Sequence, residues 1–173
     1  MKRFLLLTCL SMTALASTAQ EETAQLYGDG ERAYRSGDYQ AAILLFTKVL
    51  ALDVENLNAY LQRGFCNSLL KQYAAAASDF TAVIERKADH AWAYTSRGSA
   101  YAKLGQHEKA MADFDQVIAL DPKNEEAYNN RGWSRKALGD INGACVDWKA
   151  SKKMGNAEAK IILENKMCIR DSR

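Results

Sequence analysis

The stretch RGSAYAKLG, residues 97–105, places two glycines in a sequence that otherwise favours a helix. A glycine inside a helix costs about 1 kcal/mol relative to alanine, so a second feature must account for Gly98. The same glycine recurs at a constant step of 34 residues. Its positions are Gly30, Gly64, Gly98 and Gly132. The sequence is therefore a tandem repeat.

Three more columns repeat with the same step. Small residues recur at Ala42, Ala76, Ala110 and Ala144, and large aromatic residues recur at Phe46, Phe80, Phe114 and Trp148. A third column holds Val49, Val83, Val117 and Ser151. Counted from Thr23, the repeats are residues 23–56, 57–90, 91–124 and 125–158.

Each repeat contains two amphipathic segments. In the third repeat the pattern predicts one helix over Ala91–Leu104 and a second over His107–Leu120, with a left-handed stop at Gly105. Gly37 and Gly139 mark the same stop in repeats one and four, whereas Lys71 replaces it in repeat two. The apolar spacing is that of a helix and shows no strand-like alternation, so we expect an all-α fold.

These columns resemble the tetratricopeptide repeat. The resemblance covers residues 23–158 and implies an α-solenoid, a right-handed superhelix of helix–turn–helix pairs. Only the third repeat has the closing Pro122, and Ala33 stands in repeat one where repeat three has Tyr101. The small residues let helices approach to about 8 Å, which offsets their helix penalty. We expect a capping helix to start after the last repeat, at residues 159–165, to cover its apolar face.

Arginine and aspartate also follow the repeats, 16 residues apart. The pairs are Arg63 with Asp79, Arg97 with Asp113, and Arg131 with Asp147. Repeat one lacks both partners and has Asp29 and Leu45 instead. The pattern predicts a buried or half-buried ion pair between the two helices of a repeat. Inheritance from one duplicated unit accounts for it equally well.

The two ends of the chain differ from the repeats. Residues 1–19 have the layout of an export signal: Lys2 and Arg3, an apolar run, and small residues before a cut expected after Ala19. A membrane anchor is the alternative, but the run is shorter than the roughly 20 residues that a spanning helix needs. Residues 166–173 resemble a translated sequencing adapter, so we expect them not to be native. We therefore expect an exported protein, periplasmic or secreted.

Charge and reactive residues exclude several classes of function. Without the two ends the chain has 18 basic and 20 acidic residues, and no basic run indicates nucleic acid or an anionic membrane as partner. His90 and His107 lack nearby residues at metal-ligand spacing, and no phosphate loop or nucleophile elbow is present. We therefore expect no catalytic residue, no metal and no cofactor. Cys66 and Cys145 are two repeats apart, so we expect both to be free and buried.

The family resemblance implies a binding surface. The first helix of each tetratricopeptide repeat lines a concave groove, and unusually many aromatic residues stand at these positions here. Aromatic side chains supply much of the binding energy at protein interfaces. The expected outward-facing residues are Tyr27, Tyr34, Asn58, Leu61, Gln62, Phe65, Trp92, Ser99, Asn129, Asn130 and Trp133. For Trp92 and Trp133, packing against neighbouring helices is an equal alternative.

One subtype of the family binds a terminal carboxylate with lysine, asparagine and arginine side chains. These residues are missing at the matching positions here, so we expect recognition of a partner through its apolar side chains. The sequence favours a non-catalytic scaffold that binds a peptide or protein segment, without nucleic acid, in the bacterial cell envelope. Two alternative functions are an accessory domain of an envelope enzyme complex and a self-associating structural array. The second alternative would make the protein a homo-oligomer.

Overall fold

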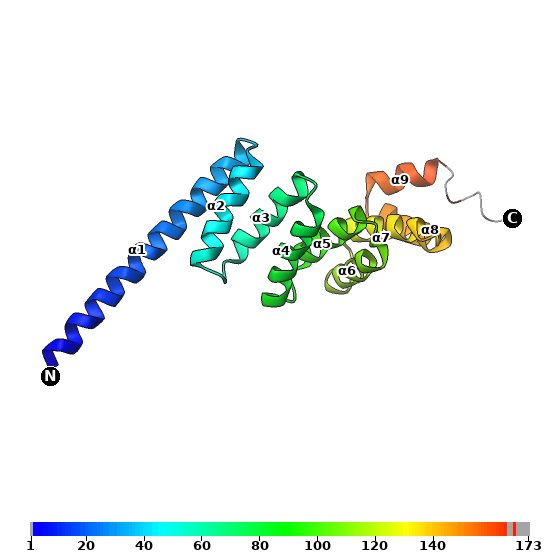
Figure 1. Ribbon diagram of the computed structural model, residues 1–173. Helices are drawn as coiled ribbons and strands as arrows, with labels where there is room; N and C mark the ends of the chain where they lie inside the picture. Colours follow the sequence, from blue (N-terminus) through cyan, green and yellow to red (C-terminus); the bar gives the residue numbers. More distant parts are fainter. Residues whose placement is uncertain (1, 166–167, 169–173) are drawn as a thin grey trace. The chain divides into compact units, whose positions relative to one another are not determined.

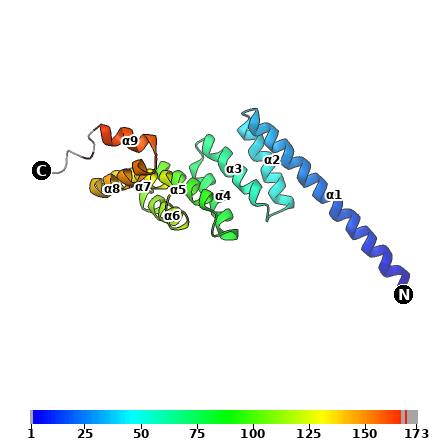
Figure 2. The ribbon, with the colours of Figure 1, turned by 180° about the vertical axis from the view of Figure 1, so that it is seen from behind.

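The computed structural model describes residues 2–165 and residue 168, with side chains from residue 18 onward. These residues form helices and no strand. The helices fall into two compact units, residues 1–71 and 72–173 (Figures 1 and 2). The fold is an all-α helical repeat solenoid, which confirms the predicted fold class.

The first unit contains three helices. They are α1 (Lys2–Arg35), α2 (Tyr39–Leu52) and α3 (Leu57–Leu69). α1 packs along α2, and α2 packs against α3. The first repeat thus consists of α1 and α2, and α1 begins well before residue 23.

The second unit contains the remaining described helices. They are α4 (Tyr73–Arg86), α5 (Ala91–Lys103), α6 (His107–Leu120), α7 (Glu125–Ala137), α8 (Ile141–Lys153) and α9 (Ala157–Glu164). Each helix packs against the next, and α5 also contacts α7. First helices of neighbouring repeats therefore meet, as stacking of helix pairs requires. The short α9 follows the last repeat and buries Ala159 and Ile162 with residues of α8.

The turns within the repeats have the predicted left-handed residues. Gly37, Gly105 and Gly139 have φ of 82°, 74° and 86°. Lys71 takes the same conformation in repeat two, with φ of 60°. A left-handed lysine is costlier than glycine because its Cβ crowds the backbone. The chain thus keeps the turn geometry even where the sequence lacks its usual residue.

The recurring mid-helix glycines lie against aromatic rings. A Cβ atom on Gly98 would lie 2.8 Å from Cε1 of Phe114, and one on Gly132 would lie 2.7 Å from Nε1 of Trp148. Gly30 approaches Phe46 in the same way, at 2.7 Å. No real Cβ tolerates these distances. The glycines therefore let each first helix close onto the aromatic residue of its second helix, and that buried contact offsets the helix penalty.

Side-chain N-caps start the first helices of repeats two, three and four. Asn56 accepts a hydrogen bond from the Ala59 amide at 3.0 Å, and Asn124 accepts one from the Ala127 amide at 2.9 Å. His90 occupies the same place before α5 and accepts from the Ala93 amide through Nδ1 at 3.2 Å. These acceptors satisfy an amide that the helix itself leaves unpaired.

Two of the predicted ion pairs are present in the second unit. Arg97 donates through Nε and Nη2 to Asp113 at 2.9 and 2.7 Å. Arg131 donates in the same way to Asp147 at 3.0 and 2.6 Å. Both pairs join the two helices of one repeat, and both carboxylates are buried. The pair Arg63–Asp79 has its members in different units and stays a prediction.

Each arginine also contacts the residue 16 positions before it, which the sequence did not reveal. Arg97 donates to the Thr81 hydroxyl at 3.0 Å, and Arg63 donates to the Thr47 hydroxyl at 3.1 Å. Arg131 donates to Asp115 at 2.6 Å. For Arg97 and Arg131, the guanidinium therefore connects the second helix of one repeat to both helices of the next.

Hydrogen bonds within these pairs shift the ionisation of their members. The bond to Asp147 raises the pKa of Arg131 above its usual value, and the bond to Asp113 does the same for Arg97. Burial raises the pKa of Asp113, against the opposing hydrogen bond and charge of Arg97. The arginines therefore stay charged at any pH at which the fold exists.

One expectation about the cysteines is wrong. Cys66 is buried and free, as expected. Cys145 is not free but forms a disulfide with Cys168, with a Cα–Cα distance of 5.7 Å. The sequence argument considered only the distance between Cys66 and Cys145. Cys168 instead lies next to Cys145 of α8. The other residues of the expected adapter segment, 166–167 and 169–173, lie outside the described residues.

Candidate functional site

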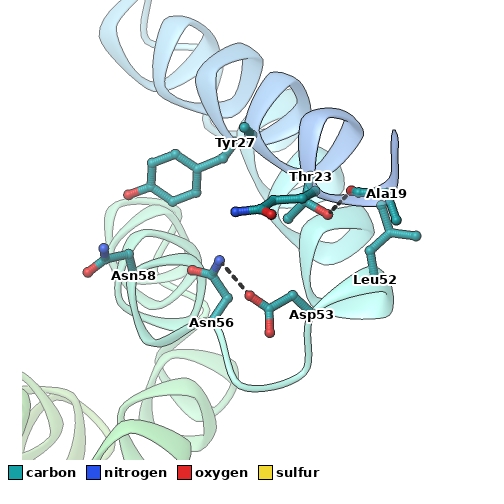
Figure 3. Close-up of a pocket in the computed structure, with 9 residues that line it drawn as sticks. Ala19, Thr23, Tyr27, Leu52, Asp53, Asn56 and Asn58 are labelled. Atoms are coloured by element: carbon teal, nitrogen blue, oxygen red, sulfur yellow. Dashed lines mark hydrogen bonds between the residues drawn. The ribbon is translucent and has the colours of Figure 1, made fainter. Parts of the chain in front are cut away.

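The expected binding residues lie on α1, α3, α5 and α7, the first helices of the four repeats. In the first unit, two of them border a hollow of about 590 Å³. In Figure 3, Tyr27 of α1 and Asn58 of α3 lie towards the left of the hollow, and Leu52 lies towards the right, with Asp53 between them at the lower edge. The full lining is Ala19, Gln20, Thr23, Ala24, Tyr27, Leu52, Asp53, Asn56 and Asn58. We call this the N-terminal hollow.

Tyr27 is held in place from two sides. Its ring packs on Phe46, with centroids 5.5 Å apart. Its hydroxyl forms a hydrogen bond with Gln62, another expected binding residue. Burial raises the pKa of Tyr27, and the nearby Glu31 charge adds to this rise. Tyr27 is therefore an uncharged, preorganised wall of the N-terminal hollow.

Other expected residues of the first unit lie apart from this hollow. Tyr34 packs against Tyr39 with ring centroids 5.7 Å apart, near the turn between α1 and α2. Leu61 and Phe65 are half-buried on α3 and are not among the residues that line the N-terminal hollow.

The second unit has a similar hollow of about 510 Å³. It brings together three expected residues, Ser99 of α5 with Asn130 and Trp133 of α7. The remaining lining residues are Ala102, Lys103, His107, Phe114, Ser134, Ala137 and Glu158. Phe114 and the alanines make part of it apolar, and Lys103 adds a positive charge. We call this the C-terminal hollow.

Trp133 packs within its own repeat and against α9. Its ring meets Trp148 edge to face, with centroids 5.2 Å apart, and its Nε1 donates to Glu158 at 3.2 Å. The Lys136 ammonium lies 4.9 Å from its ring centroid. Trp133 nevertheless keeps 36% of its surface exposed at the C-terminal hollow. Trp133 thus packs against neighbouring helices and also lines the C-terminal hollow.

The prediction for Asn129 is wrong. It was expected to face outward, but only 2% of it is exposed. Its Nδ2 donates to Glu158 at 2.7 Å, so the N-terminal turn of α9 covers it. The sequence did not indicate Glu158 because α9 lies outside the 34-residue repeat and matches no column. Glu158 is a carboxylate that the chain itself places at this end of the surface.

Among the described residues, two buried side-chain atoms of residues that line the C-terminal hollow have no hydrogen-bond partner. They are Oγ of Ser134, which is 1% exposed, and Nδ1 of His107. Buried polar groups without partners cost free energy, and both atoms are closed off from the surface of the hollow.

Trp92 lies elsewhere. It packs edge to face on Phe80, with centroids 5.9 Å apart, and near His90, at 6.4 Å. It keeps 38% of its surface exposed and is not among the residues that line the two hollows.

Within residues 2–165 and residue 168, no three His, Cys, Asp or Glu side chains gather as metal ligands. Among the same residues, no helix has both the length and the apolar character needed to cross a membrane.

Comparisons with known proteins agree with this arrangement of helices. A family model described as "Tetratricopeptide repeat" matches residues 27–89, and one described as "TPR repeat" matches residues 98–139. The first TPR domain of the human RPAP3 protein is 30% identical to this chain, with a TM-score of 0.62. The match covers 68% of this chain and 93% of that one. The chain belongs to the tetratricopeptide repeat family.

Two more solved structures are similar to this tetratricopeptide repeat protein. The first TPR of Spaghetti (RPAP3), solved bound to the HSP90 peptide SRMEEVD, is 29% identical over 69% of this chain and 94% of that one, with a TM-score of 0.64. A MamA RS-1 double mutant is 27% identical over 77% of this chain and 75% of that one, with a TM-score of 0.74. Comparison with curated protein sequences gives no match.

Proposed function

We propose that the protein is a non-catalytic scaffold that binds a segment of another protein through the first helices of its repeats. The observation that carries this proposal is the C-terminal hollow, where Ser99, Asn130 and Trp133 border an open space. That space is large enough for one or two amino-acid side chains. The solved RPAP3 repeat with its bound HSP90 peptide supports the same use of a related fold.

The lining suggests what kind of segment binds. Trp133, Phe114 and two alanines offer apolar contact, whereas Asn130 and Ser99 offer hydrogen bonds to a peptide backbone. Because Glu158 already occupies the donors of Asn129 and Trp133, they do not provide free donors for a carboxylate. Recognition then depends on an apolar side chain placed in the hollow.

The second part of the proposal concerns location. We infer that the leader, residues 1–19, directs the protein to the bacterial envelope and is removed there. Its basic start, apolar run and small residues before Ala19 support this assignment. The partner is then another protein of the envelope.

Site-specific crosslinking tests the scaffold. A photoreactive amino acid replaces Ser99 in one variant and Gln116, an exposed residue of α6 outside the hollow, in the control. We expect a defined partner band from envelope extracts at position 99 and none at position 116. Identical bands at both positions, or no band at position 99, would contradict the proposal.

A filling variant separates binding from folding. Ser99→Leu adds an apolar side chain at the hollow without removing any packing residue, so helicity measured by circular dichroism should stay unchanged. Partner capture should fall at least about tenfold, which corresponds to about 1.4 kcal/mol of binding energy. Gln116→Leu is the matched control and should capture the partner like the parent protein.

A further inference from the structure

The residues on either side of the expected cut contribute little to packing. Residues 18–22 are exposed, and Thr23 is the first half-buried residue among those with described side chains. The first buried position among them is Gly30. Removal of residues 1–19 therefore takes no described buried residue from the first unit, and Gln20 becomes the first residue of the chain.

The charge pattern of α1 agrees with a helix that starts at Gln20. As it stands, α1 begins at Lys2 and has no acidic residue in its first turn. A helix that begins at Gln20 instead has Glu21 and Glu22 in its first turn. Acidic residues stabilise a helix N-terminus and basic residues do not, because the exposed amides carry partial positive charge. A free α-ammonium group at Gln20 would oppose this arrangement.

We propose that Gln20, once exposed by removal of the leader, cyclises to pyroglutamate. This inference rests on the export part of the proposed function. The α-amine nitrogen of Gln20 attacks Cδ of its own side chain. A bond forms between that nitrogen and Cδ, the bond from Cδ to the side-chain nitrogen breaks, and ammonia leaves with a proton from the amine. No oxidant, reductant or co-reactant is needed.

Two chemical conditions favour this step. The reaction is intramolecular and closes a five-membered ring, so its effective concentration is high. The α-amine has a pKa of about 8 and is therefore partly neutral, and nucleophilic, near neutral pH. In the uncut chain the same nitrogen belongs to the peptide bond from Ala19 and cannot react.

The modification changes the N-terminal hollow. Gln20 lines it together with Asp53, whose carboxylate accepts from the Asn56 side chain at 3.1 Å (Figure 3). A free amine would bring a positive charge to the lining of the hollow that also contains this acid. The lactam has no charge but keeps one N–H donor and one carbonyl acceptor. The cut chain thus presents a neutral wall to whatever occupies the hollow.

Mass spectrometry tests the inference on the full chain. Residues 1–173 are expressed in a bacterium and recovered from the envelope fraction, and tryptic peptides are analysed. We expect the N-terminal peptide to span residues 20–32, to be lighter by one ammonia and to resist amine labelling. A synthetic 20–32 peptide with a free amine, taken through the same digestion, measures the cyclisation that arises during preparation, and it should stay mostly unmodified and labelled. The Gln20→Ser variant should start with a free amine.

The possible failures are distinguishable. A 20–32 peptide with a free glutamine amine would overturn the cyclisation and leave export intact. A chain that retains Met1, or that starts at a residue other than Gln20, would overturn the cut and the modification together. Neither result bears on partner binding, which the crosslinking at position 99 measures separately.

Discussion

At the scale of single residues, glycine shows most directly how sequence and packing are coupled. Gly98 and Gly28 both lie inside helices, and both lose helix propensity relative to alanine. They differ in surroundings, because a Cβ on Gly98 would meet the ring of Phe114 whereas one on Gly28 would lie 3.7 Å from an Arg32 nitrogen, an ordinary contact. Propensity alone cannot tell them apart, but the repeat column can.

Gly98→Ala should destabilise the protein even though alanine favours helices. The clash with a buried ring costs about 1–3 kcal/mol, which exceeds the gain of about 1 kcal/mol in propensity. Gly28→Ala has no clash and should stabilise by up to about 1 kcal/mol. Urea unfolding followed by circular dichroism measures both. Equal shifts of the two midpoints would contradict the close approach at Gly98.

Cys66 predicts a pH dependence. Burial raises the pKa of its thiol from 9.0 to about 11. The folded state therefore holds the proton more tightly than the unfolded state. This contribution to stability is complete below pH 9 and is lost as the pH rises towards 11. The unfolding midpoint should fall more steeply over this range in the parent than in Cys66→Ala, which lacks the thiol. Parallel curves would show that burial does not shift this pKa.

At the scale of helices, much of the structure could be predicted from the sequence because it depends on local pattern. The span of α6 and the left-handed stop at Gly105 match the structure, since apolar spacing and glycine act within a few residues. The sequence analysis named no N-terminal caps, and His90 differs from Asn56 and Asn124 in that histidine is not among the usual capping residues.

Contacts that link helices were predicted only where residue types repeat. The pair Arg97–Asp113 was found because its column is constant in three repeats. The second partner of each arginine was missed because that column changes from Thr47 and Thr81 to Asp115. The chemical role, a hydrogen-bond acceptor, is the same, but the residue type is not.

Among the residues of these ion pairs, Asp147 should be the one whose substitution lowers stability most. It is 1% exposed and accepts from Arg131, and Arg135 lies 2.8 Å away. Asp147→Asn keeps the shape but leaves two arginines without their common counter-charge, which should cost about 3 kcal/mol. Glu164→Gln removes an exposed partner of Lys160 and should cost less than about 1 kcal/mol. Similar losses in urea unfolding for both variants would refute the assigned role of Asp147.

At the scale of the whole molecule, the contacts at the C-terminal end were the least predictable. Glu158 bonds to Asn129 across 29 positions and to Trp133 across 25, and neither step belongs to the repeat. A contact of this kind depends on how the chain continues after α8, which no column records. Ser99 and Asn130 border a hollow, and their role in binding stays a prediction, whereas Asn129 is buried and does not face outward as expected.

The disulfide gives one prediction at this scale. The Cys145–Cys168 bridge closes a loop of 23 positions around α9, which should stabilise the full chain by about 3 kcal/mol. Reductant should therefore lower the unfolding midpoint of the full chain, whereas Cys168→Ser should not respond to reductant. Thiol titration of folded, oxidised residues 20–173 should detect none of the three cysteines, because Cys66 is buried and the other two are bridged.

Two shortened chains separate the tail from the cap. A chain that ends at Asn165 keeps α9, including its buried Ala159 and Ile162, so it should retain full helicity and match the reduced full chain in stability. A chain that ends at Gly155 lacks α9 and uncovers apolar surface of α8 around Trp148. Exposed apolar ends of repeat arrays drive association. Light scattering should therefore detect oligomers for the chain ending at Gly155 and a monomer for the chain ending at Asn165.

If both chains stay monomeric, α9 does not act as a cap. If both associate, residues after Asn165 take part in covering the last repeat.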